Sequence, residues 1–220
     1  MDSRWPKIEE VAIIDKNQPV AKAISFLQEG HDIVIVVDER SKFEGMIRTH
    51  DVVGKGINLT ALCKTYENRN IPTILEEDIK NPEIIGEMMI IGGTRYIPVL
   101  DKHSKVKGAI KDLSVLSELA SELSEIEIIN TIKEAANWEL VTLQENDTIG
   151  NALAKIREYG FSRIPIINSL GELEGVVINR SLLRTNVEKR TTFGDISGTR
   201  EKNWHLLPVK DFMFPAEFVP

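Results

Sequence analysis

One pattern occurs three times in this chain: an apolar run ends at Asp or Asn, and a glycine follows seven residues later. The three segments are Ile33 to Gly45, Tyr96 to Gly108 and Arg163 to Gly175. A repeat with a fixed internal order constrains the fold strongly, because every copy must form the same structural unit. Two further apolar residues follow each glycine, so each copy reads as strand, polar turn, strand. The sequence therefore predicts three hairpins.

A helical pattern precedes each hairpin. Apolar residues recur at a spacing of three and four, and Asn81 and Pro82 are suited to begin the middle helix. We expect Gly30, Gly92 and Gly160 to end the three helices in the left-handed conformation. The apolar positions are Val20, Ala23, Ile24 and Leu27 in the first copy, Ile85, Met88 and Met89 in the second, and Ile149, Ala152, Leu153 and Ile156 in the third.

The repeating unit is strand, helix, strand, strand, helix. The last helix is clearest over residues 113–129. The runs over 33–37 and 96–100 do not alternate, as expected of strands covered on both faces. This pattern predicts an α/β (α+β) fold.

Composition narrows the class of protein. Hydrophobic residues make up 42% and charged residues 28% of 220 residues, which is typical of a folded globular chain. No apolar run approaches the ~20 residues of a membrane span, and the start lacks a signal peptide. Cys63 alone excludes an internal disulfide or a thiolate cluster. We expect a cytoplasmic protein that does not enter a membrane.

Charge and motif content argue against a nucleic-acid-binding protein and against an enzyme. The net charge of −7 disfavours binding to a nucleic-acid backbone. The four histidines lack metal-ligand spacing, and Gly92 with Gly93 is better explained as a turn than as a phosphate loop. Cys63 shares a helical stripe with Leu59, Leu62 and Tyr66, which predicts a buried linker helix rather than a nucleophile. Neither a catalytic pair nor a cofactor loop is apparent, so an enzyme is not expected.

These repeats resemble the CBS (cystathionine-β-synthase) domain family, whose strand ends in Pro-Val-Val-Asp before a turn and a glycine. Residues 97–101 and 164–168 fit this pattern, with Ile35 replacing the proline in the first copy. The resemblance implies tandem β-α-β-β-α repeats paired into Bateman modules. We assign repeat 1 to 6–57, repeat 2 to 70–125 and repeat 3 to 130–188, with an incomplete repeat 4 beginning at 205–220.

The resemblance also implies adenine nucleotides, AMP, ADP or ATP, or a related adenosine compound, as ligands in clefts between repeats. The family motif is glycine, two apolar residues, Thr or Ser, two variable residues, then Asp, Asn or Ser. Its last position contacts ribose and its Thr or Ser faces phosphate. Asp51 fits the ribose position of repeat 1, while Ser114 and Ser181 are weaker substitutes in repeats 2 and 3. Arg48, Lys111 and Ile178 replace the Thr or Ser.

Each candidate has a structural alternative. Arg48 and Lys111 occupy matching positions, so both are candidates to meet phosphate in one cleft, or else lie solvated or ion-paired at a strand end. Asp51 is either the ribose ligand or an N-cap of the second helix. Arg163 lies where the family carries a phosphate contact, or simply covers a sheet edge, and Tyr96 takes that place in repeat 2.

Two functions follow from these alternatives. The first is a regulatory module that binds an adenine nucleotide and signals to an effector protein, which the sequence does not identify. The second is a structural or dimerisation module with degenerate nucleotide sites. Because residues 205–220 are too short to complete repeat 4, repeat 3 is expected to expose an apolar face. We expect a second copy of the chain to cover it as a homodimer, unless the chain is part of a longer protein.

Overall fold

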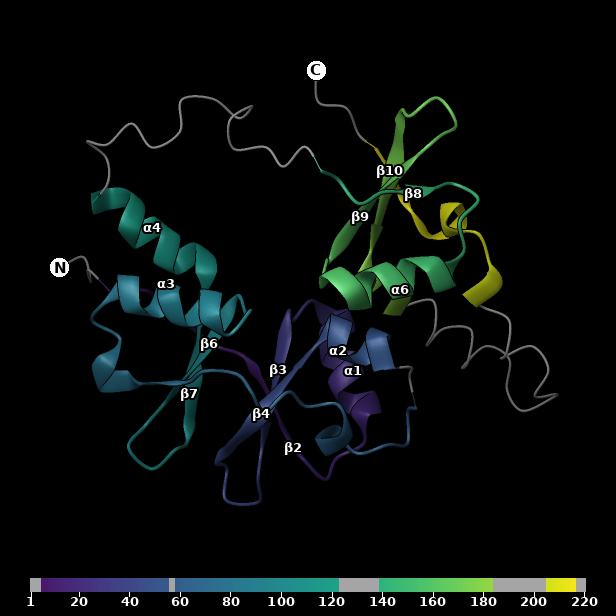
Figure 1. Cartoon of the computed structure of the whole chain (residues 1–220). Helices are drawn as coiled ribbons and strands as arrows, with labels where there is room; N and C mark the ends of the chain where they lie inside the picture. Colours follow the sequence, from purple (N-terminus) through teal and green to yellow (C-terminus); the bar gives the residue numbers. More distant parts are fainter. Residues whose placement is uncertain (1–4, 56–57, 123–138, 184–204, 217–220) are drawn as a thin grey trace. The chain divides into compact units, whose positions relative to one another are not determined.

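The computed structural model of the protein describes residues 5–55, 58–122, 139–183 and 205–216 (Figure 1). These residues fall into two compact units. Unit 1 draws on Met1–Ala23, Ile33–Ile47 and Thr60–Asn137, and unit 2 draws on Ile24–Asp32, Arg48–Leu59 and Trp138–Pro220. The chain passes from one unit to the other within its first long helix and again at the end of the first hairpin.

Repeat 1 forms a sheet of three strands in the order β2-β3-β4. Its strands β2 and β3 are parallel, and every residue of β3 is buried, as the non-alternating run predicts. The four apolar residues predicted for the first helix are also buried. The elements are β2 (Ala12–Asp15), α1 (Val20–Glu29), β3 (Ile33–Val37), β4 (Phe43–Arg48) and α2 (Thr49–Lys55).

The sheet of repeat 2 has four strands in the order β1-β7-β6-β5, and β1 comes from the residues assigned to repeat 1. Asn81 caps α3 by accepting the N–H of Ile84 at 3.2 Å, and Pro82 is the first helical residue, as predicted. Gly92 ends α3 as its C-cap, as predicted, but the left-handed conformation predicted for it is wrong: its φ is −79°, and Gly93 takes the left-handed φ of 54° instead. The elements are β1 (Ile8–Glu9), β5 (Ile74–Leu75), α3 (Pro82–Ile91), β6 (Tyr96–Leu100), β7 (Val106–Lys111) and α4 (Asp112–Glu122).

Gly92 is needed for space rather than for a left-handed backbone. A Cβ atom at this position would lie 2.5 Å from Cδ of Pro72. Gly160 does end its helix in the left-handed conformation, at φ 68°, and Gly30 has a φ of 117°. Of the helix predicted over 113–129, the part after residue 122 lies outside the described residues.

Repeats 1 and 2 share a core within unit 1. One buried cluster combines strand residues of repeat 1 with residues of repeat 2, so the two sheets pack face to face. Their pairing confirms the predicted arrangement of the repeats as a module. The cluster consists of Ile33, Ile35, Val37, Met46, Ile71, Tyr96 and Ala109.

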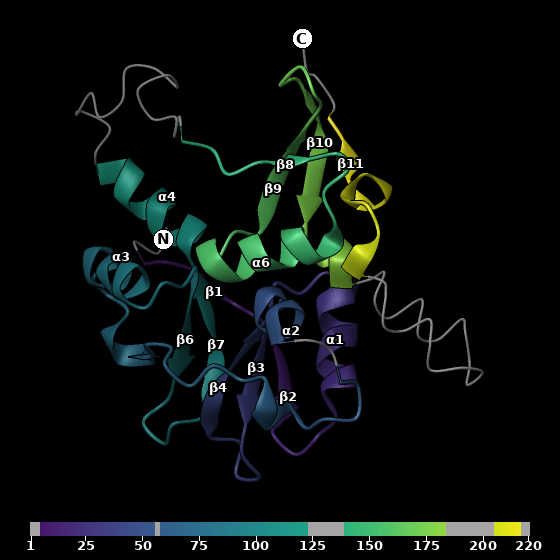
Figure 2. The ribbon, with the colours of Figure 1, turned by 45° about the vertical axis from the view of Figure 1, so that its right-hand side comes forward.

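Unit 2 contains the sheet of repeat 3, in the order β11-β10-β9-β8 (Figure 2). In contrast to β3 and β6, strand β9 alternates between buried and more exposed residues, so one face of this sheet is less covered. Helix α6 begins after Thr148, whose hydroxyl accepts the N–H of Asn151 at 3.2 Å. The elements are β8 (Leu143–Gln144), α6 (Ile149–Tyr159), β9 (Arg163–Ile167), β10 (Leu173–Ile178) and β11 (Phe214–Pro215).

The three repeated glycines have one common cause. Next to each of them the backbone of a distant segment passes too close for a side chain. A Cβ atom would lie 2.8 Å from the carbonyl oxygen of Asn68 at Gly45, 2.5 Å from that of Glu9 at Gly108, and 2.4 Å from that of Phe214 at Gly175. The glycine therefore marks where a remote segment joins each hairpin.

Residues 205–216 join repeat 3 as residues 61–68 join repeat 1. Ile149 N donates to the carbonyl of Leu207 at 2.9 Å, and Val209 N donates to that of Asp147 at 2.8 Å. Val20 N makes the equivalent bond to Ala61 at 2.7 Å. The C-terminal segment thus completes the sheet of repeat 3, and its role as the start of a fourth repeat stays a prediction. The predicted linker 189–203 lies outside the described residues.

The linker after repeat 1 differs from its prediction. Its helical stripe forms only one short turn, Cys63–Thr65, although Cys63 and Tyr66 are buried. Beyond the turn the chain is extended, because Asn68 forms a bridge with Met46 of β4. Pairing with the hairpin edge thus overrides the local helical spacing.

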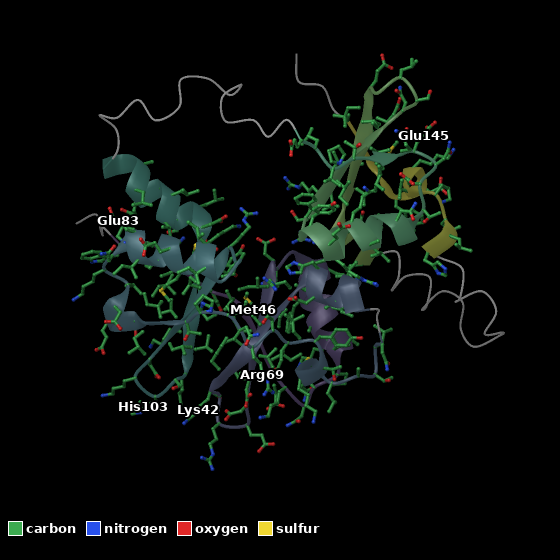
Figure 3. All side chains as sticks on the ribbon, viewed as in Figure 1. Lys42, Met46, Arg69, Glu83, His103 and Glu145 are labelled. Carbon is green, nitrogen blue, oxygen red and sulfur yellow. The ribbon has the colours of Figure 1, made fainter. Side chains whose placement is uncertain are left out.

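The Asp or Asn that ends each first strand holds the hairpin turn. The Asp38 carboxylate accepts the N–H groups of Arg40 and Lys42, each at 2.8 Å. Asp101 and Asn168 make the equivalent bonds in repeats 2 and 3. In unit 1 the tips of the first and second hairpins meet, because Lys42 and Lys105 form an isolated backbone β-bridge. Lys42 and His103, at these two tips, lie near one another (Figure 3).

Candidate functional site

Each hairpin leads into a helix at a sharp corner, and the candidate residues lie at these corners. A corner consists here of the last residue of the second hairpin strand and the first three residues of the following helix. The corners are 48–51 in repeat 1, 111–114 in repeat 2 and 178–181 in repeat 3. The strand fixes the first residue, while the helical turn brings the fourth residue back toward it.

In repeat 1 the corner is closed by an ion pair. Asp51 Oδ2 accepts the backbone N–H and the Nε–H of Arg48, both at 2.9 Å, and Oδ1 accepts Nη2–H at 3.1 Å. The side chains of Arg48 and Asp51 are only 16% and 11% exposed. The Nε2 atom of His50 lies 3.5 Å from Asp51 Oδ1. Asp51 is therefore already engaged by its own corner.

The structure corrects the capping interpretation of Asp51. Helix α2 begins at Thr49, so Asp51 lies inside the first turn and is not the N-cap. It reaches back to the N–H of Arg48, which is the second half of a capping box. A ribose diol would have to share this carboxylate with the Arg48 guanidinium or displace it. The role of Asp51 as a ribose ligand stays a prediction.

The electrostatics of this corner favour a neutral His50. Burial lowers the pKa of His50, and the Arg48 cation adds to this effect, while the Asp51 carboxylate opposes it. At neutral pH the corner therefore carries the opposite charges of Arg48 and Asp51.

In repeat 2 the corner carries a lysine over an aromatic ring. The Nζ atom of Lys111 lies 5.5 Å from the ring centroid of Tyr96, which is directly opposite it in the sheet. The Ser114 hydroxyl accepts the backbone N–H of Lys7 at 2.6 Å. Asp112 begins α4 and forms an ion pair with Arg95. Ser114 thus takes part in attaching the N-terminal segment.

In repeat 3, Ser181 belongs to the corner, and Arg163 lies beside it on the neighbouring strand β9. Arg163 is exposed on β9 and pairs in register with Ile178, the last residue of β10. The Ser181 hydroxyl donates to the carbonyl of Ile178 at 2.7 Å, and its oxygen lies 3.2 Å from that of Phe212. The serine is therefore positioned by backbone groups, one of them in the C-terminal segment.

The corners of repeats 1 and 3 belong to the same unit. Helices α2 and α6 pack together there, and Arg180 of repeat 3 donates to Asp32, in the loop before β3, at 3.1 Å. Lys111 and Ser114 belong to unit 1. Whether Asp51 and Lys111 line one cleft therefore stays a prediction.

Arg180 and Asp32, which are 148 positions apart, were not among the residues predicted from the sequence. One local signal was available. Repeat 3 has Ile178 where the other repeats have Arg48 and Lys111, and Arg180 is the only cation of its corner.

The environment of the Cys63 thiol disfavours its reaction as a nucleophile. Cys63 is buried, and burial is the main cause that raises the pKa of its thiol to about 11, with help from the Glu67 and Asp15 carboxylates. Among residues 5–55, 58–122, 139–183 and 205–216, no group of three or more His, Cys, Asp or Glu is arranged to hold a metal ion. Within the same residues, no helix is both long and apolar enough to cross a membrane.

Comparison with known sequences gives one family. The family model described as "CBS domain" matches residues 8–57 and 132–188. Protein MJ1404 of Methanocaldococcus jannaschii is 25% identical over 200 residues, which are 87% of this chain and 45% of that protein. An inosine-5'-monophosphate dehydrogenase of Halobacterium salinarum is 27% identical over 140 residues, 64% of this chain and 25% of the enzyme. The chain spans less than half the length of the curated relatives it matches.

Solved structures share the fold. Protein MJ1225 of Methanocaldococcus jannaschii, described as a proposed archaeal homologue of g-AMPK, superposes with a TM-score of 0.79 at 14% identity. The match covers 96% of this chain and 81% of that one. A conserved protein of Pyrococcus horikoshii has a TM-score of 0.56 at 16% identity, covering 100% and 80% of the two chains. At such identities the likeness concerns the fold.

Proposed function

The chain belongs to the CBS-domain family, and on this premise we propose that it is a non-catalytic regulatory module that binds an adenine nucleotide, AMP, ADP or ATP. In the proposal, binding shifts the module between two states and an effector protein responds, which requires unequal affinity of the ligand for the two states. We place the module in the cytoplasm, where a single reduced cysteine is stable.

One observation carries the proposal. Unit 2 brings together the corners of repeats 1 and 3, which contain Arg48 and Arg180, and also Arg163, which pairs in register with the corner residue Ile178, in a chain whose net charge is −7. Arginine binds phosphate through paired N–H groups, so a concentration of arginines in an acidic protein favours a phosphorylated ligand. In the proposal, Asp51 and Ser181, the last residues of these corners, orient the sugar.

Calorimetry and thermal unfolding with AMP, ADP and ATP test the proposal, with GTP as the control for the base. A ligand that binds only the folded state stabilises it by about 2.7 kcal/mol at a ligand concentration of 100 Kd, and so raises Tm. We expect saturable binding of at least one adenine nucleotide and weaker binding of GTP. Absence of both heat and Tm shift with all three adenine nucleotides would contradict it.

Substitution of Arg48 and Asp51 separates the ligand role from the capping role. We expect Asp51→Ala to weaken binding several-fold or more, since a hydrogen bond to a charged group contributes about 1.5 to 3 kcal/mol. Arg48→Gln removes the phosphate contact and also releases the Asp51 carboxylate from the guanidinium, so its effect on affinity is the sum of the two changes. If Asp51→Ala lowers Tm but leaves the affinity unchanged, Asp51 is only a helix-capping residue.

A structural or dimerisation module is the second candidate, favoured by two observations. The polar groups of the corners already bind one another, as in the Arg48 and Asp51 pair. The open face of the repeat 3 sheet also carries Pro165, Ile167 and Val176, whose counterparts in repeat 1 are buried in the core shared with repeat 2. We propose that a second copy covers this face.

Light scattering at micromolar concentration tests the dimer. We expect twice the mass of 24.8 kDa, and Ile167→Glu should return the protein to a monomer because it places a charge on the proposed interface. Glu174→Gln, a change at an exposed position of the neighbouring strand β10, is the control. A monomeric wild-type protein with repeat 3 folded would exclude the dimer.

A further inference from the structure

We infer that Arg180 is the anion-binding residue of the repeat 3 corner and that Asp32 of repeat 1 holds it until a phosphate group takes the place of the carboxylate. The inference rests on the proposed function and adds to it a residue, a competing group and a consequence of binding. Neither residue belongs to the positions that the family motif identifies.

Position is the first argument. Repeat 1 and repeat 2 carry a cation at the end of the second hairpin strand, Arg48 and Lys111, but repeat 3 has Ile178 there. Arg180 follows two residues later, in the first helical turn, where repeat 2 has the apolar Leu113. Repeat 3 thus has its cation at a different position of the corner. Without Arg180, only Arg163 would supply positive charge to this corner.

The contacts of Arg180 are the second argument. Nη2 donates to Asp32 Oδ1 at 3.1 Å and to the carbonyl oxygen of Gly30 at 3.4 Å. Toward the described residues, Nε and Nη1 make no hydrogen bond. Repeat 1 therefore holds Nη2. Both paired edges of a guanidinium, Nε with Nη2 and Nη1 with Nη2, include this nitrogen, so a phosphate gains a paired N–H contact once Nη2 leaves Asp32.

Because both side chains are partly exposed, replacing the Asp32 carboxylate by a phosphate at Arg180 costs little free energy. The side chains of Arg180 and Asp32 are 37% and 49% exposed, so their ion pair lies in a region of high dielectric and contributes little to stability. A phosphate carries more charge than a carboxylate and offers three oxygens. It should therefore displace Asp32 from the guanidinium when the nucleotide binds to the corner of repeat 3.

The exchange has a structural consequence within unit 2. The Arg180 contacts fasten repeat 3 to the loop between α1 and β3, next to the packing of α2 on α6. When phosphate takes the guanidinium, this fastening is released while the helix packing stays. Binding of an anion in repeat 3 is thereby coupled to the loop of repeat 1, as a ligand-dependent change of state requires.

Calorimetry with ADP and with inorganic tripolyphosphate tests the inference in four proteins: wild type, Asp32→Asn, Arg180→Gln and the double variant. We expect Arg180→Gln to weaken one binding site by roughly tenfold or more, because it loses a charge-assisted pair of bonds. Asp32→Asn should tighten the same site several-fold because it removes the competing carboxylate. The double variant should bind like Arg180→Gln, because the inference has the Asp32 carboxylate compete with the ligand for the Arg180 guanidinium. Arg157→Gln, an equal change of charge at an exposed position of α6, is the control.

A direct signal locates the effect. In ¹⁵N-labelled protein the Nε–H resonance of Arg180, assigned by its loss in Arg180→Gln, should shift on titration with tripolyphosphate. If the wild type binds none of AMP, ADP, ATP and tripolyphosphate, the proposed function fails and the inference fails with it. If the wild type binds ADP but Arg180→Gln leaves its affinity unchanged, or Asp32→Asn weakens binding, only the inference is overturned, and the pair is a structural fastening.

Discussion

Replacing Gly175 by alanine tests the explanation of the repeated glycines. The added Cβ atom would lie 2.4 Å from the carbonyl oxygen of Phe214 and 2.9 Å from Sδ of Met213. The methionine side chain can move, but the oxygen belongs to strand β11, which pairs with β10 at this position. Strand β11 must therefore shift or detach from the sheet.

The expected cost follows from this crowding. Inserting a methyl group into a packed site costs about 1 to 3 kcal/mol. For a chain of this size 1 kcal/mol corresponds to roughly 2 to 4 °C, so we expect Tm to fall by ~2 to 12 °C. Gly86→Ala is the matched control. Its Cβ would meet only Val115 Cγ1 at 3.8 Å, and alanine favours the interior of α3 by about 1 kcal/mol.

Differential scanning calorimetry and amide exchange provide the two measurements. We expect Gly175→Ala to lower Tm and to speed exchange at the β10 amides, while Gly86→Ala raises Tm. In a chain shortened to residue 206, which lacks β11, Gly175→Ala should cost little. An unchanged Tm for Gly175→Ala in the full chain would refute the close approach of β11 as the reason for the glycine.

Three further predictions concern single side chains. Burial lowers the pKa of His50, so as the pH falls below about 6.5 the unfolded chain takes up a proton on His50 before the folded chain does. The free energy of unfolding should therefore fall more steeply with falling pH in the wild type than in His50→Gln. Calorimetry between pH 7 and 5 measures this difference. The Cys63 thiol, with a pKa of about 11, should resist a disulfide reagent at pH 8 in the folded protein and react at once in denaturant; rapid reaction of native protein would contradict its burial. The Glu67 side chain is 1% exposed and pairs with Arg69, so Arg69→Ala should lower Tm more than Glu67→Leu, because it leaves a buried charge unpaired.

The hairpins and helices could be predicted because their signals are local. The turn residue Asp38 and the capping pair of Asn81 and Pro82 act within a few positions of themselves. The reason for Gly175 could not be predicted, because the strand that crosses it lies near residue 214. A fixed spacing shows that a glycine is required, but it does not identify the distant backbone that requires it. The buried linker helix was wrong for the same reason, since pairing with β4 outweighs a local spacing.

The sequence predicted where the candidate residues lie in the fold, but it did not predict which groups they contact. Asp51 and Ser181 lie at the predicted corners, yet each is engaged by groups within its own corner. Such pairs are set by side-chain reach across a turn or between repeats, which residue spacing does not reveal. Arg180 and Asp32 illustrate the limit, because no local pattern links two residues in different repeats.

These internal pairs bear on how a ligand could regulate the protein. In the structure, the Arg48 guanidinium binds Asp51 and the Arg180 guanidinium binds Asp32. A phosphorylated ligand that uses either arginine must replace a carboxylate, so its binding free energy is reduced by the strength of that pair. The buried pair of repeat 1 opposes exchange more than the exposed pair of repeat 3, since screening by water weakens the latter. On the proposed function, we therefore expect a nucleotide to occupy the repeat 3 corner at lower concentration than the repeat 1 corner, so that one module would respond over two ranges of ligand concentration.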